Sequence, residues 1–272
     1  MRRALLTVLL IPTIVIGVTS CALPTRPPQP AAPTTTPIVT QPDTPPPAPG
    51  SAIPGVDKLQ IIATQVEQQT GAKIGIATST EAAGTISTGP AWSTAKVPVA
   101  IAALRNNSAT TQSNMWAAIT ASDNQAAASL WESLGSPTTA ASATDQVLRD
   151  GGDATTHTQS QILRPGFSAF GQTQWRLIDQ AGFAEHMSTI AGGSDVLVAM
   201  SNIAADQRYG LGTIPGAVFK GGWGPEPENG YVVRQFGLMP GPKPYGIAVM
   251  VVTDNYQSGQ YALSLAAKYL QA

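Results

Sequence analysis

Cysteine and histidine are scarce in this sequence, and their scarcity excludes several kinds of chemistry. Of 272 residues, one is cysteine and two are histidine. With Cys21 alone, the chain forms no internal disulfide and no metal site built from thiolates. His157 and His186 have no acidic or cysteine neighbours at ligand spacing, so we expect neither a metal ion nor another cofactor.

Charged residues are also few, because Asp, Glu, Lys and Arg make up only 11% of the chain. The 15 basic side chains are balanced by 16 acidic ones, so neither sign dominates. Proteins that bind nucleic acid or an anionic surface usually carry a clear basic excess. The balance seen here therefore gives no reason to expect either as a partner.

The N-terminus carries a targeting segment. Arg2 and Arg3 precede an apolar stretch at 4–18, and small residues then lead directly to Cys21. This pattern resembles a bacterial lipoprotein signal, which implies that residues 1–20 are removed and that the new first residue, Cys21, is lipid-modified. The implied location is the outer face of the bacterial cell membrane. The alternative is a single membrane-spanning anchor, for which the apolar stretch is short.

A proline-rich segment at 21–55 separates this signal from the body of the chain. Positions 22–55 hold 12 of the 23 prolines, mixed with Thr, Ala and Gln. Such a composition cannot bury a core and favours extended conformations of about 3 Å per residue. We interpret the segment as a tether that holds residues 56–272 away from the bilayer.

The remaining residues, 56–272, are long enough for one sizeable domain with a mixed helix and strand pattern. Residues 136–172 are rich in Gly, Thr, Ser and Gln and are expected to be mostly loop. Helices are predicted at 56–70, 93–105, 115–121, 127–134, 173–188, 194–204 and 262–269. Strands are predicted at 72–78, 84–88, 216–222, 231–238 and 245–252.

This order places strands at both ends of the body and helices between them. It predicts an α+β domain in which both ends of the chain build one antiparallel sheet, with a helical insert in the middle.

Ser93 and Lys96 stand three residues apart at the start of the predicted helix at 93–105. Residues at this spacing lie on one face of a helix, so the hydroxyl and the amine point into the same space. A lysine whose pKa is lowered by burial can take the proton of a serine and so activate it as a nucleophile. The alternative is a helix N-cap followed by a solvated lysine.

Two further polar elements follow, each with a structural alternative. Ser122 to Asn124 lies in the turn between two apolar helices and alone suggests a helix cap. Lys220 to Gly222 lies at a strand end and alone suggests a solvated lysine and a bend. In this order S-x-x-K, S-D-N and K-G-G resemble the signatures of class A β-lactamases and penicillin-binding DD-peptidases. The resemblance covers residues 56–272 and implies a β-lactamase/transpeptidase-like α/β sandwich.

The resemblance also implies a role for each matching residue. Ser93 would be the acylated nucleophile, Lys96 its proton acceptor, and Ser122 a relay of the proton to the leaving nitrogen. Asn124 would bind the side-chain amide of the substrate, and Lys220 would supply positive potential near the substrate carboxylate. The implied function is acyl transfer in the cell envelope, with a peptidoglycan-type peptide or a β-lactam as ligand.

Other residues near the third element would complete this substrate site. Gly222 belongs to the K-G-G element, and the backbone N–H groups of Ser93 and Trp223 would form the oxyanion hole. Arg234, in the following strand, would assist carboxylate binding, as a basic residue does in several family members. A surface salt bridge is the alternative interpretation of Arg234.

Two departures from the family pattern affect the cleft. Gly221 stands where a residue with a hydroxyl usually binds the substrate carboxylate. Only 28 residues, at positions 94–121, separate Ser93 from Ser122, which is shorter than is usual in class A β-lactamases. We therefore expect a reduced helical insert.

A third departure concerns release of the acyl group. No acidic residue lies between Asp153 and Asp179, and Gln159 and Gln161 occupy the region of the glutamate that deacylates class A enzymes. General-base assistance typically contributes about 100- to 10,000-fold to a rate. We therefore expect any acyl-enzyme to hydrolyse slowly.

Three functions are compatible with these features. The first is a serine hydrolase with slow deacylation, and the second is an inactive lipoprotein that binds envelope peptides or a protein partner. The third is a β-lactamase with a rearranged base. The joint presence of Ser93, Lys96, Ser122, Asn124 and Lys220 favours an enzyme, because turning two lysines into a cleft is costly without a chemical role.

Overall fold

The computed structural model describes residues 53–105, 109–226 and 230–272. The expected signal at 1–20, Cys21 and most of the expected tether at 21–55 lie outside these residues. None of the described helices is long and apolar enough to cross a membrane.

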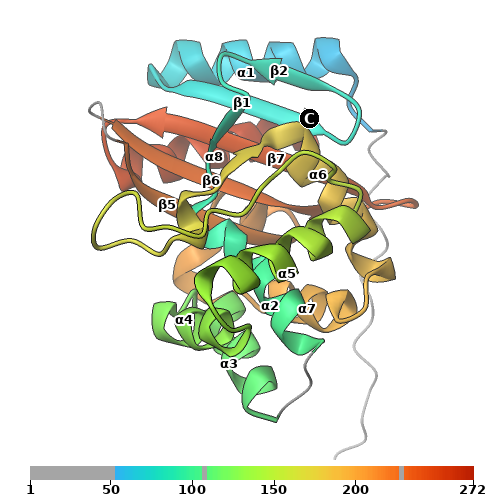
Figure 1. The fold of residues 1–272 in the computed structure, drawn as a ribbon. Coiled ribbons are helices and arrows are strands. Elements are labelled where there is room, and N and C mark those ends of the chain that lie inside the picture. The colour runs from blue at the N-terminus through green and yellow to red at the C-terminus, as the bar shows by residue number, and fades with distance from the viewer. Residues whose placement is uncertain (1–52, 106–108, 227–229) are drawn as a thin grey trace, which may run out of the picture. The chain divides into compact units, whose positions relative to one another are not determined.

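A five-stranded antiparallel sheet forms the centre of the domain (Figure 1). Its strands are β1 (Lys73–Thr78), β2 (Ala82–Gly84), β5 (Val218–Glu226), β6 (Gly230–Met239) and β7 (Tyr245–Thr253). They stand in the order β2-β1-β7-β6-β5, so the first strands of the domain lie beside the last one. Lys73 of β1 pairs with Val252 of β7, for example. The predicted α+β fold, with a sheet built from both ends of the chain, is confirmed.

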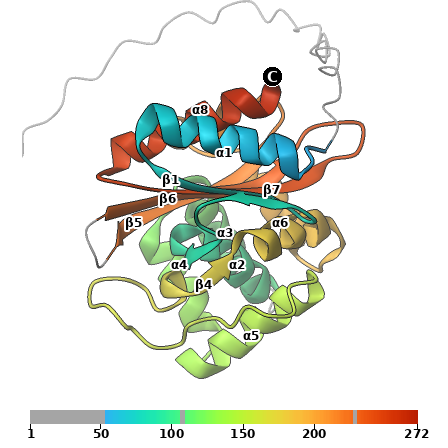
Figure 2. The ribbon, with the colours of Figure 1, turned by 90° about the horizontal axis from the view of Figure 1, so that it is seen from above.

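Two helices from opposite ends of the domain cover one face of the sheet. They are α1 (Val56–Thr70) and α8 (Tyr256–Gln271), which lie together above the sheet in Figure 2. Helix α1 buries Leu59 and Ile62 at helical spacing and ends, as predicted, at Gly71. Gly71 has a φ of +68°, which glycine adopts without the steric penalty of a side chain.

The helical middle of the chain covers the other face (Figure 2). Helix α2 (Lys96–Leu104) is buried at each of its nine positions, as expected for a helix that is apolar all round after its first residue. The other helices of this layer are α3 (Ala109–Thr120), α4 (Asn124–Ser133), α5 (Pro137–Asp150), α6 (Leu177–His186) and α7 (Gly193–Met200).

Helix α5 forms within the segment 136–172 that the sequence predicts to be mostly loop. Ser136 caps it by accepting a hydrogen bond from the Thr139 N–H at 3.2 Å. The helix buries small or polar side chains such as Ala140 and Thr144 on its inner face. It also buries Val147 and Leu148 at helical spacing from these residues, so the period is present. The prediction of loop followed the Gly, Thr, Ser and Gln content of the whole segment and missed it.

The predicted strand at 84–88 is divided between two sheets. Strand β2 ends at Gly84, whose φ of +98° turns the chain. Strand β3 (Thr88–Pro90) then pairs with β4 (Gln174–Arg176), which occupies the start of the helix predicted at 173–188. Short 3-10 helices lie at Trp92–Ala95, Phe170–Gln172, Met187–Thr189, Ala205–Gln207 and Gly210–Thr213.

Candidate active site

Ser93 lies in the 3-10 helix Trp92–Ala95, which runs directly into α2. The preceding residue, Trp92, has a φ of +49°, in the left-handed region that is unfavourable for a bulky side chain. Such strain is concentrated at functional sites, where the surrounding packing maintains it. Thr94 fixes the turn, because its N–H and its hydroxyl both donate to the carbonyl of Ala91. Ser93 is thus held at a helix N-terminus, where the helix dipole favours negative charge.

Lys96 begins α2 and is only 2% exposed. Its Nζ donates to the carbonyl oxygen of Ser122 at 2.5 Å and to Oδ1 of Asn124 at 2.8 Å. The Ser122 hydroxyl and the Asp123 carbonyl lie at 3.3 Å. Burial lowers the pKa of Lys96 from 10.5 to about 8, against the opposing effect of the Asp123 carboxylate. A neutral amine is therefore accessible near neutral pH, as a general base requires.

Ser122 presents its hydroxyl between two lysines. The hydroxyl oxygen lies 3.3 Å from Lys96 Nζ and 3.0 Å from Lys220 Nζ. Ser122 itself has a φ of +57°, a second non-glycine residue in the left-handed region. Asp123 fixes this turn, because its side chain caps α4 by accepting the Ala126 N–H at 2.8 Å. The segment at 122–124 therefore caps helix α4 and also presents the Ser122 hydroxyl to the two lysines.

Lys220 lies in β5 and is completely buried. Its Nζ donates to the Ser122 hydroxyl at 3.0 Å and to the carbonyl of Gly221 at 3.1 Å. Burial, and then the nearby Lys96 ammonium, lower the pKa of Lys220 well below its usual range. The alternative of a solvated lysine at a strand end is therefore wrong.

Gly222 brings strand β5 against the backbone of the Ser93 turn. A Cβ at Gly222 would lie 2.8 Å from the Ser93 nitrogen and 2.9 Å from the Ala91 carbonyl oxygen, so the approach requires glycine. Strand β5 is an edge strand, which leaves N–H groups on its free side without a partner strand. Trp223 follows Gly222 and lines the space beside Ser93. An oxyanion hole from the N–H groups of Ser93 and Trp223 stays a prediction.

A cavity of about 580 Å³ opens beside Ser93, a volume suited to a small organic ligand. Its boundary includes the Ser93 turn, residues 122–124, strand β5 and the loop at 162–170. Ser93, Lys96, Ser122 and Asn124 contribute its reactive polar groups. The apolar part of the wall includes Trp92, Ile162, Phe167, Phe170, Trp223 and Tyr231.

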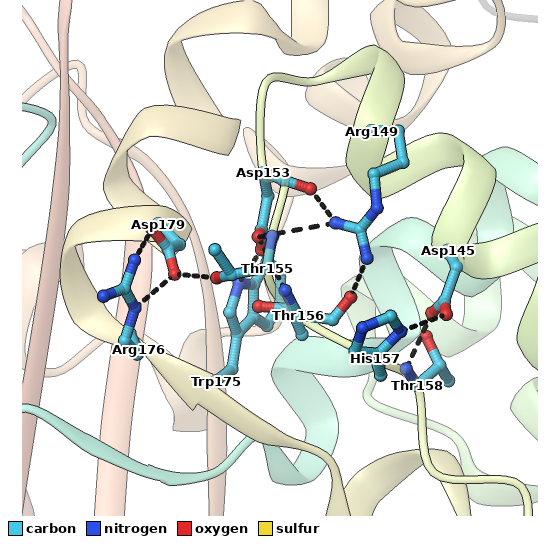
Figure 3. Close-up of polar contacts among 10 residues, drawn as sticks. All are labelled: Asp145, Arg149, Asp153, Thr155, Thr156, His157, Thr158, Trp175, Arg176 and Asp179. Atoms are coloured by element: carbon cyan, nitrogen blue, oxygen red, sulfur yellow. Dashed lines mark hydrogen bonds and ion pairs between the residues drawn. The ribbon is translucent and has the colours of Figure 1, made fainter.

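Buried polar contacts fix the base of the loop at 151–172 (Figure 3). Asp153 is 1% exposed, accepts the indole N–H of Trp175 at 2.9 Å and lies 3.7 Å from the Arg149 guanidinium. Asp145 accepts the Thr158 N–H at 2.6 Å. Because these contacts hold the start of the loop, its later residues are positioned along the wall of the cavity.

Neither Gln159 nor Gln161, in the region of the family's glutamate, lines the Ser93 cavity. The Gln159 N–H donates to the Thr173 hydroxyl at 2.9 Å, and the Gln159 side chain accepts the Gln161 N–H at 2.9 Å. Gln159 lines a separate pocket together with His157. Among the described residues that line the Ser93 cavity, none is aspartate or glutamate. The described wall therefore supplies no carboxylate base.

Arg234 lies outside the cavity, and the structure corrects both interpretations of it. Its guanidinium is 0% exposed and donates to the carbonyls of Gly89 at 2.8 Å, Pro90 at 3.0 Å and Trp175 at 3.2 Å. It also donates to Oε1 of Gln180 at 2.6 Å. Burial lowers the pKa of Arg234 to about 9, which still leaves it charged at neutral pH. Arg234 pairs with Gly222 of β5 and shares its face of the sheet, the one covered by the helical middle, where the carbonyls of Gly89 and Pro90 enclose its guanidinium.

Sequence reasoning did not find that Arg234 supports the nucleophile turn. Gln180, which accepts from Arg234, donates to the Thr94 hydroxyl at 3.0 Å. The Thr94 hydroxyl in turn donates to Ala91. This chain of hydrogen bonds joins β6 to the residues on either side of Ser93, and no motif in the sequence marks it.

Arg164 was also missed, although it ties the cavity loop to the sheet. Its guanidinium lies over the rings of Trp92 and Phe167, at 5.7 and 5.0 Å from their centroids. Its Nη1 donates to the carbonyl of Pro225 in β5 at 2.7 Å. A lone arginine in a polar loop gives no sequence signal for these contacts.

The structure thus brings Ser93, Lys96, Ser122 and Asn124 into the wall of one cavity, with Lys220 buried behind the Ser122 hydroxyl. The sheet order and the helical layer define the class of fold, which is the α+β fold of class A β-lactamases and penicillin-binding proteins. No protein-family profile and no curated protein sequence matches the chain.

Solved structures match almost over their full length, at low sequence identity. The TLA-3 extended-spectrum β-lactamase aligns with a TM-score of 0.63 at 13% identity, over 80% of this chain and 98% of its own. A class A β-lactamase from Mycobacterium abscessus aligns with a TM-score of 0.59 at 16% identity, over 78% and 97%. A mutant of PBP-A, in an acyl-enzyme complex with penicillin G, aligns with a TM-score of 0.57 at 19% identity, over 80% and 98%. These similarities establish the fold.

Proposed function

We propose that this protein is a serine acyl-transfer hydrolase of the cell envelope that forms an acyl-enzyme on Ser93 and releases it slowly. The observation that carries the proposal is the Ser122 hydroxyl, which lies within hydrogen-bonding distance of both Lys96 and Lys220. Burying two lysines around one hydroxyl is costly for a structure alone. Proton transfer next to Ser93 gives both of them a role.

Acylation begins when neutral Lys96 takes the proton of the Ser93 hydroxyl and the oxygen attacks a substrate carbonyl. In the structure Lys96 Nζ donates to residues 122–124, so the neutral amine must turn its lone pair towards Ser93 to accept this proton. Backbone N–H groups of Ser93 and Trp223 would stabilise the oxyanion, and one such donor is commonly worth about 3 kcal/mol. The bond to the leaving nitrogen then breaks.

The leaving nitrogen needs a proton, which the Ser122 hydroxyl supplies. Ser122 regains a proton from Lys96, which holds the one taken from Ser93, at 3.3 Å. Lys220 donates a hydrogen bond to the same hydroxyl oxygen and so stabilises the negative charge that develops on it while the proton moves. The net result is an ester on Ser93 and a protonated leaving group, with no proton gained or lost overall.

Deacylation is the slow step of this proposal. Water must attack the ester, and the described lining of the cavity contains no carboxylate to take its proton. Loss of such a base reduces a rate by about 100- to 10,000-fold. The candidate acyl donors are peptidoglycan-type peptides and β-lactams, in line with the acyl-enzyme complex of a PBP-A mutant with penicillin G.

Labelling with a fluorescent penicillin tests the proposal directly. The wild-type protein should retain the label through denaturing electrophoresis, and the Ser93→Ala variant should not. Ser194→Ala, which removes an exposed serine in α7, is the matched control and should label normally. Absence of Ser93-dependent labelling at high probe concentration would refute the proposal.

An inactive lipoprotein that binds envelope peptides or a protein partner is the second candidate. It is favoured by Gly221, which offers no hydroxyl, and by the lack of a carboxylate in the described lining. This function does not need the Ser93 hydroxyl. It therefore predicts that cells carrying Ser93→Ala behave like the wild type, whereas the enzyme predicts the phenotype of a deletion.

We also propose that the protein is anchored to the outer face of the membrane by a lipid on Cys21. The proposal is supported by the sequence pattern at 1–21. Fractionation of cells tests it, because the Cys21→Ala variant cannot carry the lipid and should leave the membrane fraction. A membrane fraction that is unchanged in Cys21→Ala favours the spanning anchor instead.

A further inference from the structure

Strand β5 gives the cavity beside Ser93 two ends. Lys220 of β5 contacts the Ser122 hydroxyl at 3.0 Å, so the leaving group of the proposed reaction departs at this end. Gly222 lies against the Ser93 turn, and because a strand rises about 3.3 Å per residue, the part of β5 after Gly222 continues away from Ser122. The leaving group and the acyl group lie on either side of the attacked carbonyl. The acyl group therefore lies towards the second end.

Aromatic and apolar side chains form the wall of the cavity at this acyl end. Gly224 of β5 packs so closely on the Trp92 indole that no room is left for a Cβ. Phe167, from the loop, contacts the same indole edge to face, with 5.0 Å between the ring centroids. We refer to the apolar lining residues of this end as the acyl wall: Trp92, Ile162, Phe167, Phe170, Pro225 and Tyr231.

Arg164 joins the loop part of the acyl wall to its strand part. Its guanidinium lies over the Trp92 and Phe167 rings, at 5.7 and 5.0 Å from their centroids. The same guanidinium donates to the carbonyl of Pro225 in β5 at 2.7 Å. These contacts fix the rings before a ligand binds, which lowers the entropic cost of binding. Arg164 itself is not among the residues that line the cavity.

Ile162 presents apolar surface at the rim of this end. It is 63% exposed although it lines the cavity beside Ser93. The next residue, Leu163, is 62% exposed but lines the separate pocket that contains His157. An apolar ligand group that covers Ile162 removes both surfaces from water, which favours binding in proportion to the area buried.

We infer that the acyl wall selects acyl donors that carry an aromatic or long aliphatic group on the acyl side of the scissile bond. The inference rests on the proposed function and specifies its substrate class. Full burial of one such group changes an equilibrium by about 10- to 100-fold. A small group at the same place forgoes this gain, and a charged group also loses its hydration against the rings.

Penicillins with acetyl, octanoyl, phenylacetyl and phenylmalonyl side groups provide matched acyl donors, because they share one nucleus and one leaving group. The phenylmalonyl compound differs from the phenylacetyl one by a single carboxylate. Acylation of Ser93 in the full-length protein is followed by intact mass, with Ser93→Ala as control. Each second-order rate constant is divided by that of the same compound with hydroxide, to remove intrinsic reactivity. The octanoyl and phenylacetyl compounds should react about tenfold faster than the acetyl compound, or more, and the phenylmalonyl compound no faster than the phenylacetyl one.

The outcomes separate the two proposals. If no compound acylates Ser93, the proposed function fails and the inference fails with it. If all react and the acetyl compound is as fast as the others, the inference alone is overturned. A phenylmalonyl compound that reacts faster than the phenylacetyl one also overturns it, because the added carboxylate would then have found a partner such as Arg164 at this end.

Ile162→Thr and Leu163→Thr refine the test, since the two residues are neighbours of nearly equal exposure and only Ile162 lines the Ser93 cavity. Ile162→Thr should lower the ratio of the octanoyl rate to the acetyl rate several-fold, and Leu163→Thr should leave this ratio unchanged. An unchanged ratio in Ile162→Thr, or an equal fall in both variants, would contradict the inference.

Discussion

Lys96 should make the stability of the folded protein rise with pH. Its pKa is 10.5 in an unfolded chain and about 8 in the folded protein. Between these values the unfolded chain binds the proton and the folded chain has released it, so raising the pH favours folding. From about pH 7 to about pH 9.5, these two pKa values give a gain of about 2 kcal/mol in the free energy of unfolding.

The gain is isolated by comparing the wild type with Lys96→Met. The pKa of Lys220 also lies well below its usual range, so Lys220 too makes stability rise with pH. Because Lys220 is present in both proteins, its contribution largely cancels in the comparison. The window ends below about pH 10 because Tyr209, Tyr231 and Tyr256 have raised pKa values. Their unfolded forms ionise first above about pH 10, which lowers stability again.

Urea unfolding at several pH values measures the difference. The free energy of unfolding of the wild type, minus that of Lys96→Met, should increase by about 2 kcal/mol across the window. Lys268→Met removes an exposed lysine in α8 and should give a curve parallel to the wild type. A flat difference for Lys96→Met would show that Lys96 does not carry the lowered pKa required of the general base.

Three further predictions concern catalysis and packing. Nitrocefin hydrolysis should show a burst of one equivalent of product per protein, followed by steady turnover about 100-fold or more slower, because the described cavity lining has no carboxylate base. Fast steady turnover would contradict this. Gly222→Ala should cost about 1–3 kcal/mol in thermal unfolding, because its Cβ would lie 2.8 Å from the Ser93 nitrogen, whereas Gly221→Ala should cost little. Arg234→Met leaves buried acceptors unpaired, so it should lower the free energy of unfolding by about 3 kcal/mol or more and slow acylation. Arg234→Lys should be intermediate. An unchanged melting temperature would refute the role of the network.

Much of the fold follows from the sequence because its strongest elements are locally encoded. Helix α1 has apolar residues at helical spacing and a glycine that ends it, and both features operate within fifteen residues. Strand β7 is rich in β-branched residues and β6 in apolar ones, and their pairing is set by burial. Helix α5 was missed because the Gly, Thr, Ser and Gln content of residues 136–172 favours loop, which hid the helical spacing of Ala140, Thr144, Val147 and Leu148 on its inner face.

The site was predictable to the extent that spacing determines it. Lys96 follows Ser93 by one helical turn, and Ser122 to Asn124 lies in a turn between helices, so both are set by local chain geometry. Arg234 is different, because helices cover both faces of the sheet, and strand alternation does not tell which buried partners a side chain meets. Its true partners, Gly89, Pro90 and Gln180, come from distant segments that only the folded chain brings together.

The sheet that joins the two ends of the domain also sets when the site can exist during synthesis. Strand β1 is made early in the domain, but its partner β7 is the last strand of the domain that the structure describes. Lys220, likewise, is 98 residues later in the chain than the Ser122 hydroxyl it contacts. Pairings of such long range form slowly and only after most of the domain has been made. A growing chain therefore carries Ser93 without its reactive surroundings, and the nucleophile is assembled only when the whole domain is available to fold.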